Sequence, residues 1–214
     1  EIMKKALILT TTMMVFMAQG LKAQSFVGGG LSVCSSSSST TFGSTTEDND
    51  KSFSFGFYPK AGYFITKKFA LGMGIGIGTS KYTEFDSSGD EIITRSNSWE
   101  VAPFARFYFK EVGNLSFFGE GVLSVGGSKQ INEYTGYEDV TNKFFSISER
   151  ISPGISYSLS EKIELESILG SIGSTTSIHN RPASETNEDY KDVSTSFGLN
   201  FGLDDLYFGI IVKL

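Results

Sequence analysis

The most constraining feature of the sequence is residues 69–79, FALGMGIGIGT, in which large apolar residues alternate with small ones. Successive side chains of a β-strand point to opposite faces, so this segment predicts a strand with one bulky face and one nearly bare face. A helix would spread the glycines around its axis, at a cost of about 1 kcal/mol each relative to Ala. The pattern suits the wall of a narrow barrel whose outer face meets lipid and whose inner face needs space.

The composition agrees with a β-rich chain whose hydrophobicity is hidden by alternation. The 214 residues include 24 Gly, 19 Phe and 9 Tyr, and the mean hydropathy is -0.06. A membrane barrel is compatible with an average near zero, because only alternate residues of each strand face lipid. The net charge of -6 gives no basic footprint for nucleic acid, and a single His with a single Cys gives no metal-ligand set. We therefore expect no metal and no cofactor.

The start of the chain has the pattern of a secretory signal peptide. Met3 is followed by two lysines, an apolar run over residues 6–17 and a small residue at Ala23. We expect residues 1–23 to be the signal, with Glu1 and Ile2 upstream of the start, and residues 24–214 to form the exported domain. The alternative is a membrane anchor, although the run is too short to span a bilayer.

The rest of the chain predicts eight strands joined by alternately short and long connections. The expected strands cover residues 26–36, 52–65, 69–83, 96–110, 115–131, 143–159, 163–178 and 192–214. Three connections are tight turns, at 66–68, 111–114 and 160–162, and the four longer ones are polar and rich in acidic residues, at 37–51, 84–95, 132–142 and 179–191.

Two irregularities are expected within these strands. In the last strand the apolar parity shifts by one residue at Asp204 and Asp205, which predicts a β-bulge or a break. Pro59, Pro103 and Pro153 recur along the chain, each a short way before a tight turn. Proline cannot donate a ladder hydrogen bond, and a closed barrel has no edge, so we interpret all three prolines as bulges at one level of the wall.

The ordered set of features resembles the small eight-stranded outer-membrane barrels of Gram-negative bacteria, the OmpX/OmpA-like group, also called the porin family. The resemblance covers residues 24–214 and rests on the signal peptide, the Pro-x-x-x-[YF] strands with short turns, the glycine-laced strand and the apolar final strand. It implies an antiparallel up-and-down transmembrane barrel with periplasmic turns and outer loops. The family usually ends in an aromatic residue, whereas this chain ends in Leu214.

Charged residues on the small-residue face form the candidate site. If the bulky face meets lipid, these charges point into the barrel, where charges of both signs should pair because an unpaired buried charge is costly. We expect a structural salt-bridge network that plugs the lumen; the alternative is an ion pathway. The expected network is Lys60, Glu100, Arg106, Glu120, Arg150, Glu164 and Glu166. Glu149 falls on the lipid face by the same parity.

No catalytic residue is expected. Residues 74–78, GIGIG, resemble half of a nucleotide-binding fingerprint but lack the helix that must follow it. His179, with Ser177, Glu185 and Glu188, could suggest an acyl hydrolase, although we interpret His179 as a surface residue opening a polar loop. Cys34 has no second His to activate it as a nucleophile.

The sequence therefore predicts a non-enzymatic, monomeric outer-membrane barrel that presents four acidic loops at the cell surface. Its expected partners are outer-membrane lipid, lipopolysaccharide and, during biogenesis, the barrel-assembly machinery. Three alternatives stay open: a narrow porin-like channel, a lipid-modifying enzyme on the same barrel, and a soluble lipocalin-like carrier with its bulky face turned inward.

Overall fold

The computed structural model describes residues 24–42, 45–85, 91–134, 139–181, 190–201 and 207–214. The expected signal peptide, the parity shift at Asp204 and Asp205, and the acids Glu185 and Glu188 lie outside these ranges. The described residues form ten strands: β1 (Ser25–Phe42), β2 (Thr45–Thr66), β3 (Phe69–Phe85), β4 (Glu91–Val112), β5 (Leu115–Tyr134), β6 (Val140–Ser158), β7 (Ile163–Ile168), β8 (Ser171–Arg181), β9 (Tyr190–Asn200) and β10 (Tyr207–Lys213).

Eight of the ten strands close an antiparallel barrel. Following the pairings around the ring gives β1, β2, β3, β4, β5, β6, β7, β10 and then β1 again. The prediction of an all-β, eight-stranded antiparallel barrel with up-and-down order is confirmed. The ring closes at the end of the molecule that carries the tight turns, where Lys213 near the end of the chain is paired with Phe26.

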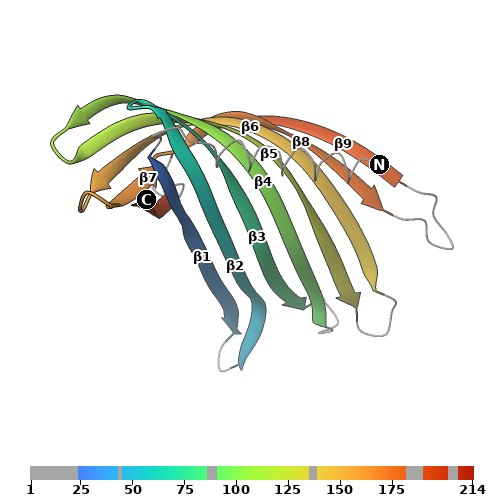
Figure 1. The fold of residues 1–214 in the computed structure, drawn as a ribbon. Helices are drawn as coiled ribbons and strands as arrows, with labels where there is room; N and C mark the ends of the chain where they lie inside the picture. Colours follow the sequence, from blue (N-terminus) through green and yellow to red (C-terminus); the bar gives the residue numbers. More distant parts are fainter. Residues whose placement is uncertain (1–23, 43–44, 86–90, 135–138, 182–189, 202–206) are drawn as a thin grey trace.

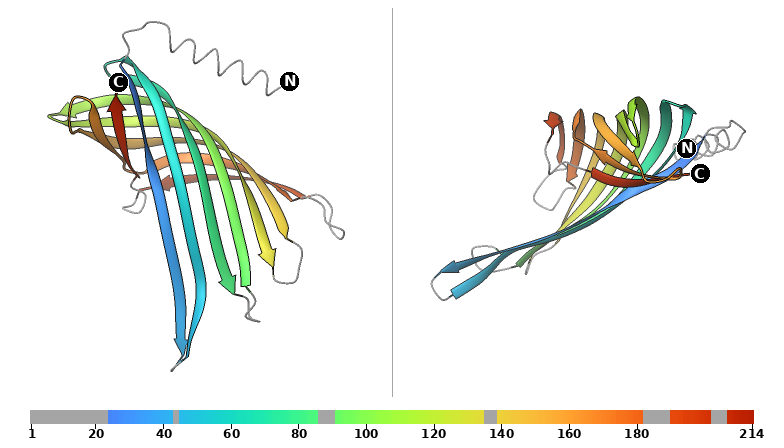
Figure 2. Two further views of the ribbon diagram at one scale, coloured as in Figure 1. Left: turned by 60° about the horizontal axis from the view of Figure 1, so that its bottom comes forward. Right: turned by 90° about the vertical axis from the view of Figure 1, so that its left-hand side faces the viewer.

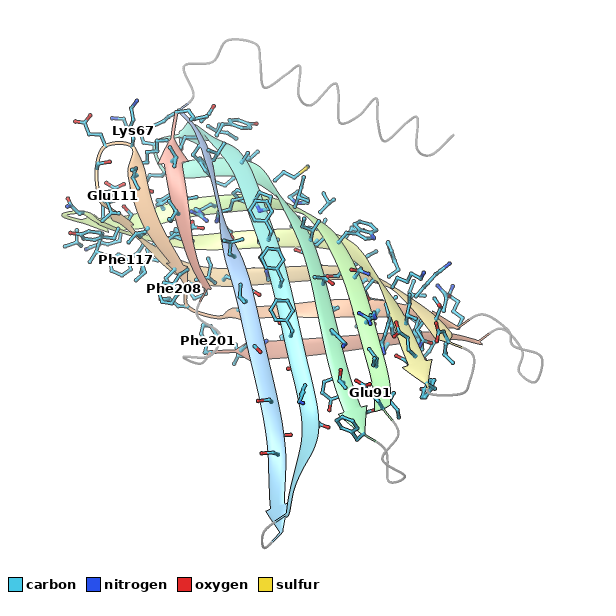
Figure 3. The ribbon with its side chains drawn as sticks, turned by 90° about the horizontal axis from the view of Figure 1, so that it is seen from below. Lys67, Glu91, Glu111, Phe117, Phe201 and Phe208 are labelled. Atoms are coloured by element: carbon cyan, nitrogen blue, oxygen red, sulfur yellow. The ribbon has the colours of Figure 1, made fainter. Side chains whose placement is uncertain are left out.

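The two remaining strands continue the wall toward the opposite end. β8 continues β7 along β6, and β9 runs beside β8. The single strands expected over 163–178 and 192–214 are therefore each divided in two. Figure 1 shows the strands lying side by side in one curved sheet, and Figure 2 shows how strongly it curls at the end with the turns. In Figure 3, Lys67 and Glu111 mark this turn end and Glu91 marks the opposite, loop end.

The hairpins at the loop end are longer than the sequence predicted. The expected loop over 37–51 is largely paired strand, since β1 runs to Phe42 and pairs with β2 from Thr45 onward. Similarly, β4 begins at Glu91, inside the connection expected over 84–95. The polar composition of these segments misled the prediction, because stretches rich in Ser, Thr and acidic residues resemble loops in composition even where they form paired strands.

The prolines do not act as the prediction stated. The register of the β2–β3 ladder is the same before and after Pro59, and that of the β4–β5 ladder is the same before and after Pro103. Pro59 itself has no ladder partner in β3, and Pro103 has none in β5. Of the three prolines, only Pro153 lies where the register changes, between the β6–β7 and β6–β8 ladders. The bulges expected at Pro59 and Pro103 are therefore wrong: the wall omits a ladder bond that the proline cannot donate and keeps its register.

The glycines of the inner face form sockets for inward-pointing side chains. A Cβ atom added at Gly72 would overlap the ring of Phe104, and one at Gly62 or Gly154 would overlap Phe26 or Phe118. These aromatic rings are buried, so the bare face predicted by the alternation is the packed interior of the barrel. Phe64 and Tyr108 join this interior, where Phe64 contacts Phe26 and Tyr108 contacts Phe118.

Candidate functional site

The centre of the barrel interior is a guanidinium held between two carboxylates. Arg106 on β4 is 1% exposed. Its Nε and Nη2 atoms donate to one oxygen of Glu120 on β5, at 2.9 and 2.5 Å. Its Nη1 atom lies 2.9 Å from a carboxylate oxygen of Glu166 on β7. Arg106 and Glu120 are directly opposite in the ladder, so the strand register itself brings this pair together.

A second cation completes the cluster. Lys60 on β2 forms an ion pair with the other carboxylate oxygen of Glu166. Glu166 is only 2% exposed, and it links Lys60 and Arg106 across the interior. We call Lys60, Arg106, Glu120 and Glu166 the quartet. Two positive and two negative side chains balance each other, which offsets the large desolvation penalty of burying them.

Aromatic rings enclose the guanidinium of Arg106. Its Cζ atom lies 3.9 Å from the ring centroid of Phe118 and 5.9 Å from those of Phe104 and Tyr108. Nη1 also donates to the Tyr108 hydroxyl at 3.2 Å. A planar guanidinium suits this setting because it stacks on rings while its edge donates hydrogen bonds.

The other charges expected in the network lie elsewhere. Glu164 forms a separate ion pair with Lys213 on β10 and accepts a hydrogen bond from Ser158 at 3.1 Å. Glu100 and Arg150 line a cavity of about 390 Å³ next to the quartet. Within the described part of the chain, neither Glu100 nor Arg150 makes an ion pair or a hydrogen bond.

Two residues of this interior were not singled out by sequence reasoning, Lys213 and Tyr108, whereas parity places Phe118 inward, where the structure has it. A signal was available in the parity of β4, because Phe104, Arg106 and Tyr108 occupy consecutive inward positions and all three are buried. Which glycine admits which ring depends on the strand register, and no single strand contains that information.

The remaining candidates have ordinary surroundings. His179 stacks on Phe144 at 4.4 Å between ring centroids, and its Nε2 lies 3.2 Å from the Asn142 side-chain oxygen. Cys34 is a free, exposed thiol on β1. The carboxylate of Glu149 is exposed on the outer face and accepts a hydrogen bond from Ser174 at 2.9 Å, so the parity that placed it outside was correct.

No three His, Cys, Asp or Glu side chains of the described part of the chain are gathered in a way that could hold a metal ion. No helix among the described residues is long and apolar enough to cross a membrane.

Comparisons with known proteins give only distant structural matches. No protein-family model matches the sequence, and no curated protein matches it. Among solved structures, neisserial surface protein A is 15% identical, with 90% of this chain and 96% of that chain covered and a TM-score of 0.36.

Two autotransporter structures are also similar. The translocator domain of NalP from Neisseria meningitidis is 11% identical, with 99% of this chain and 78% of that chain covered and a TM-score of 0.45. The transport unit of AIDA-I from Escherichia coli is 11% identical, with 91% and 76% covered and a TM-score of 0.43. Because these identities and scores are low, the function proposed below rests on the residues of this chain.

Proposed function

We propose that the protein is a non-enzymatic, integral outer-membrane barrel whose interior is plugged by its own side chains and whose loop-end hairpins project from the cell surface. The observation that carries this proposal is the division of side chains between the inner and outer faces of the barrel wall. Bulky apolar residues point out of the barrel, while the charged quartet and its aromatic rings lie within it.

The outer face supports placement in a membrane. Large apolar side chains are exposed on strands all round the barrel; Leu31, Ile75, Ile151 and Phe197 are between 52% and 73% exposed. Soluble monomers rarely expose a continuous apolar patch larger than a few hundred Å². A band of this kind is stable when lipid covers it, and in a barrel every backbone group of the wall can be paired within the bilayer.

The same division argues against a soluble carrier. A lipocalin-like barrel would turn its bulky residues inward and its glycines outward. Here Ile75 is exposed while its neighbour Gly76 is buried against Tyr58 and Glu100. The interior has no room for the bulky face, because rings already fill the sockets at Gly62, Gly72 and Gly154.

The quartet supports a plug rather than a pore. Eight strands leave an interior that side chains can just fill, whereas general porins use about 16–18 strands. Arg106 bridges carboxylates from β5 and β7 and stacks on Phe118, so one buried cluster connects strands on different sides of the ring. A narrow channel is the second candidate, and the cavity of about 390 Å³ beside the quartet is the observation that favours it.

The surroundings of the barrel follow from this placement. Lipid would cover the outer face, lipopolysaccharide would contact the loop end, and the barrel-assembly machinery would insert the chain. Beyond the apolar band, Arg95 donates to Glu133 at 2.7 Å, and this hydrogen bond raises the pKa of Arg95. Paired charges at this level suit the polar, lipopolysaccharide-facing side of the interface. We propose that the barrel acts as a monomer.

Fractionation tests the placement. The expressed protein should sediment with outer membranes, resist extraction by carbonate and require detergent for solubility. Unheated samples should migrate differently from boiled ones on a denaturing gel, since a closed barrel stays folded in mild detergent. Recovery in the soluble periplasmic fraction would overturn the proposal and favour the carrier.

A further inference from the structure

The wall of the barrel is paired all round at the turn end but parts on one side toward the loop end. β1 pairs with β10 only from Phe26 to Gly29, and beyond Gly29 its described residues pair with β2 alone. Within the described strands, β9 pairs only with β8. We call the gap between β1 beyond Gly29 and β9 the seam; Figure 1 shows these two strands at opposite margins of the curved sheet.

Glycines with unusual backbone angles lie near the start of the seam, one on β1 and one a strand in from β9, next to Asn200. Gly29 has φ of 151° at the point where β1 leaves β10. Gly170 has φ of 131° between the end of β7 and the start of β8. Side chains disfavour such angles, so glycine is needed at both positions. The wall therefore turns at a glycine on β1 and at a glycine between β7 and β8, close to where the seam begins, while the ring on the turn side stays closed.

A cavity lies at the level of these bends. Its lining includes Gly170, Ser171 and Asn200 from the seam side, and Pro59, which is the ladder partner of Gly29. Its volume of about 390 Å³ falls within the range of small-molecule sites, roughly 300–1,000 Å³. The quartet residues Lys60 and Glu120 also contribute to the lining, so the plug bounds the cavity on one side.

The lining combines apolar walls with one available acid and one available base. Tyr58, Phe104 and Val122 supply apolar surface. Lys60 and Glu120 are committed to the quartet, whereas Glu100 and Arg150 make no ion pair or hydrogen bond with any described residue. A ligand that satisfied both would carry an ammonium group for Glu100 and a phosphate or carboxylate for Arg150.

We propose that this cavity binds a single-chain zwitterionic amphiphile, which enters sideways from the bilayer through the seam. The apolar chain contacts Tyr58, Phe104 and Val122, and the headgroup lies between Glu100 and Arg150. Unpaired backbone groups are not tolerated against lipid, so β1 and β9 pair along the seam in the resting membrane state and part when the amphiphile passes. The quartet then serves as the floor of a binding site as well as a plug.

Binding can be measured on the purified protein in a neutral maltoside detergent, with lysophosphatidylethanolamine as the probe and native mass spectrometry as the readout. We expect one bound molecule per barrel. Glu100→Gln and Arg150→Ala should each weaken binding about tenfold or more, the change expected from losing a charge-assisted hydrogen bond. Lys143→Ala is the matched control, because Lys143 is exposed on the same strand as Arg150 and does not line the cavity.

The zwitterionic headgroup is tested by comparing the probe with a neutral lipid. A neutral single-chain glycolipid with the same acyl chain should bind at least about tenfold more weakly, on the same reasoning. Equal binding of the two lipids would overturn the zwitterion assignment, and no binding of either would overturn the cavity proposal. The gel shift on heating shows which variants are folded. Because membrane placement is tested separately by fractionation, failure here leaves the proposed function standing.

The route through the seam is tested with the native thiol Cys34, which lies on β1 beyond Gly29. Ser194→Cys, Ser196→Cys and Gly198→Cys introduce a partner at alternate positions of β9. We expect at least one pair to form a disulfide on oxidation. The probe should then bind at least about tenfold more slowly, and the binding rate should recover when the disulfide is reduced. If no pair crosslinks, the seam does not close. If the disulfide-linked protein binds the probe as fast as the reduced protein does, the ligand enters from the loop end. Either result overturns the sideways route.

Discussion

The turn-side and loop-side halves of the barrel are built from the same alternating pattern but differ in what fills the inner face. On the turn side, inward positions carry the rings of Phe26, Phe104 and Phe118 together with the quartet, and the strands close completely. On the loop side, β1 offers Ser32, Cys34 and Ser36 at alternate positions, and described β9 residues 191–200 are exposed at every position. In the structure, the wall is therefore closed where its interior is packed, and it parts where the inward side chains are small or exposed.

The largest effect should come from removing the guanidinium at the centre of the turn-side half. Arg106→Met keeps much of the side-chain volume but removes the cation that pairs with both Glu120 and Glu166. Glu120 then loses the ion-pair partner that it has in the structure. Breaking a buried ion pair in this way costs about 3–5 kcal/mol. Urea unfolding of the barrel in lipid vesicles would measure the loss. A change of less than about 1 kcal/mol, as for a surface pair, would show that the turn-side half does not depend on the quartet.

The next effect concerns the outer face. Ile75→Arg places a charge in the apolar band, and it should cost about 2–4 kcal/mol if Ile75 lies near the bilayer midplane. The adjacent change Gly76→Trp should destabilise for a different reason, because a side chain there would meet Tyr58 and Glu100. Folding yield into vesicles reports both. Equal tolerance of the two substitutions would contradict the assignment of inner and outer faces.

A smaller effect is expected from filling a socket. Gly72→Val would push against the ring of Phe104 and the backbone of Ala61, with an overpacking cost of about 1–3 kcal/mol. Gly121→Val is the matched control, since nothing lies within 4 Å of a Cβ atom there. Urea midpoints of the two variants should therefore differ clearly. Matching midpoints would mean that the sockets are not needed for closure.

The smallest effect should come from the exposed ion pair on the loop side. Arg95→Met removes the hydrogen bond between Arg95 and Glu133. The side chain of Arg95 is 48% exposed and that of Glu133 is 34% exposed. Pairs of this kind contribute only about 0.2–1 kcal/mol, because water and salt screen them. The same urea experiment as for Arg106→Met gives a direct comparison of one buried and one exposed arginine. A loss as large as that of Arg106→Met would remove the distinction between the two halves.

The sequence predicted the fold and the faces well because both depend on local alternation. The parity of β3 and β4 correctly placed Ile75 outside and Arg106 inside. Strand ends were predicted poorly at the loop end, since Ser-rich stretches such as 35–39 resemble loops in composition. The division of the last two strands follows from the pairing of β7 with β10 and β8 with β9, which only the register reveals.

The sequence predicted which charged residues lie in the interior but not which of them pair with each other. Parity identifies which charges point inward, but the partner of each depends on how strands are staggered around the ring. Glu164 and Glu166 have the same parity on β7, yet one pairs with Lys213 and the other with Lys60 and Arg106. Glu100 and Arg150 share that parity too and line the cavity. The sequence of a single strand holds no information about stagger, so these differences could not be predicted.

Conductance across a planar lipid bilayer tests the central claim, that the packed turn-side half closes the barrel to solutes. The purified wild-type protein should give no stable, regular current steps, because the quartet and its rings occupy the interior. Arg106→Ala and Glu120→Ala, if they remain folded by the gel shift, should introduce steps by opening the plug. Large, regular, ion-selective steps from the wild-type protein would contradict the account and make the barrel a channel.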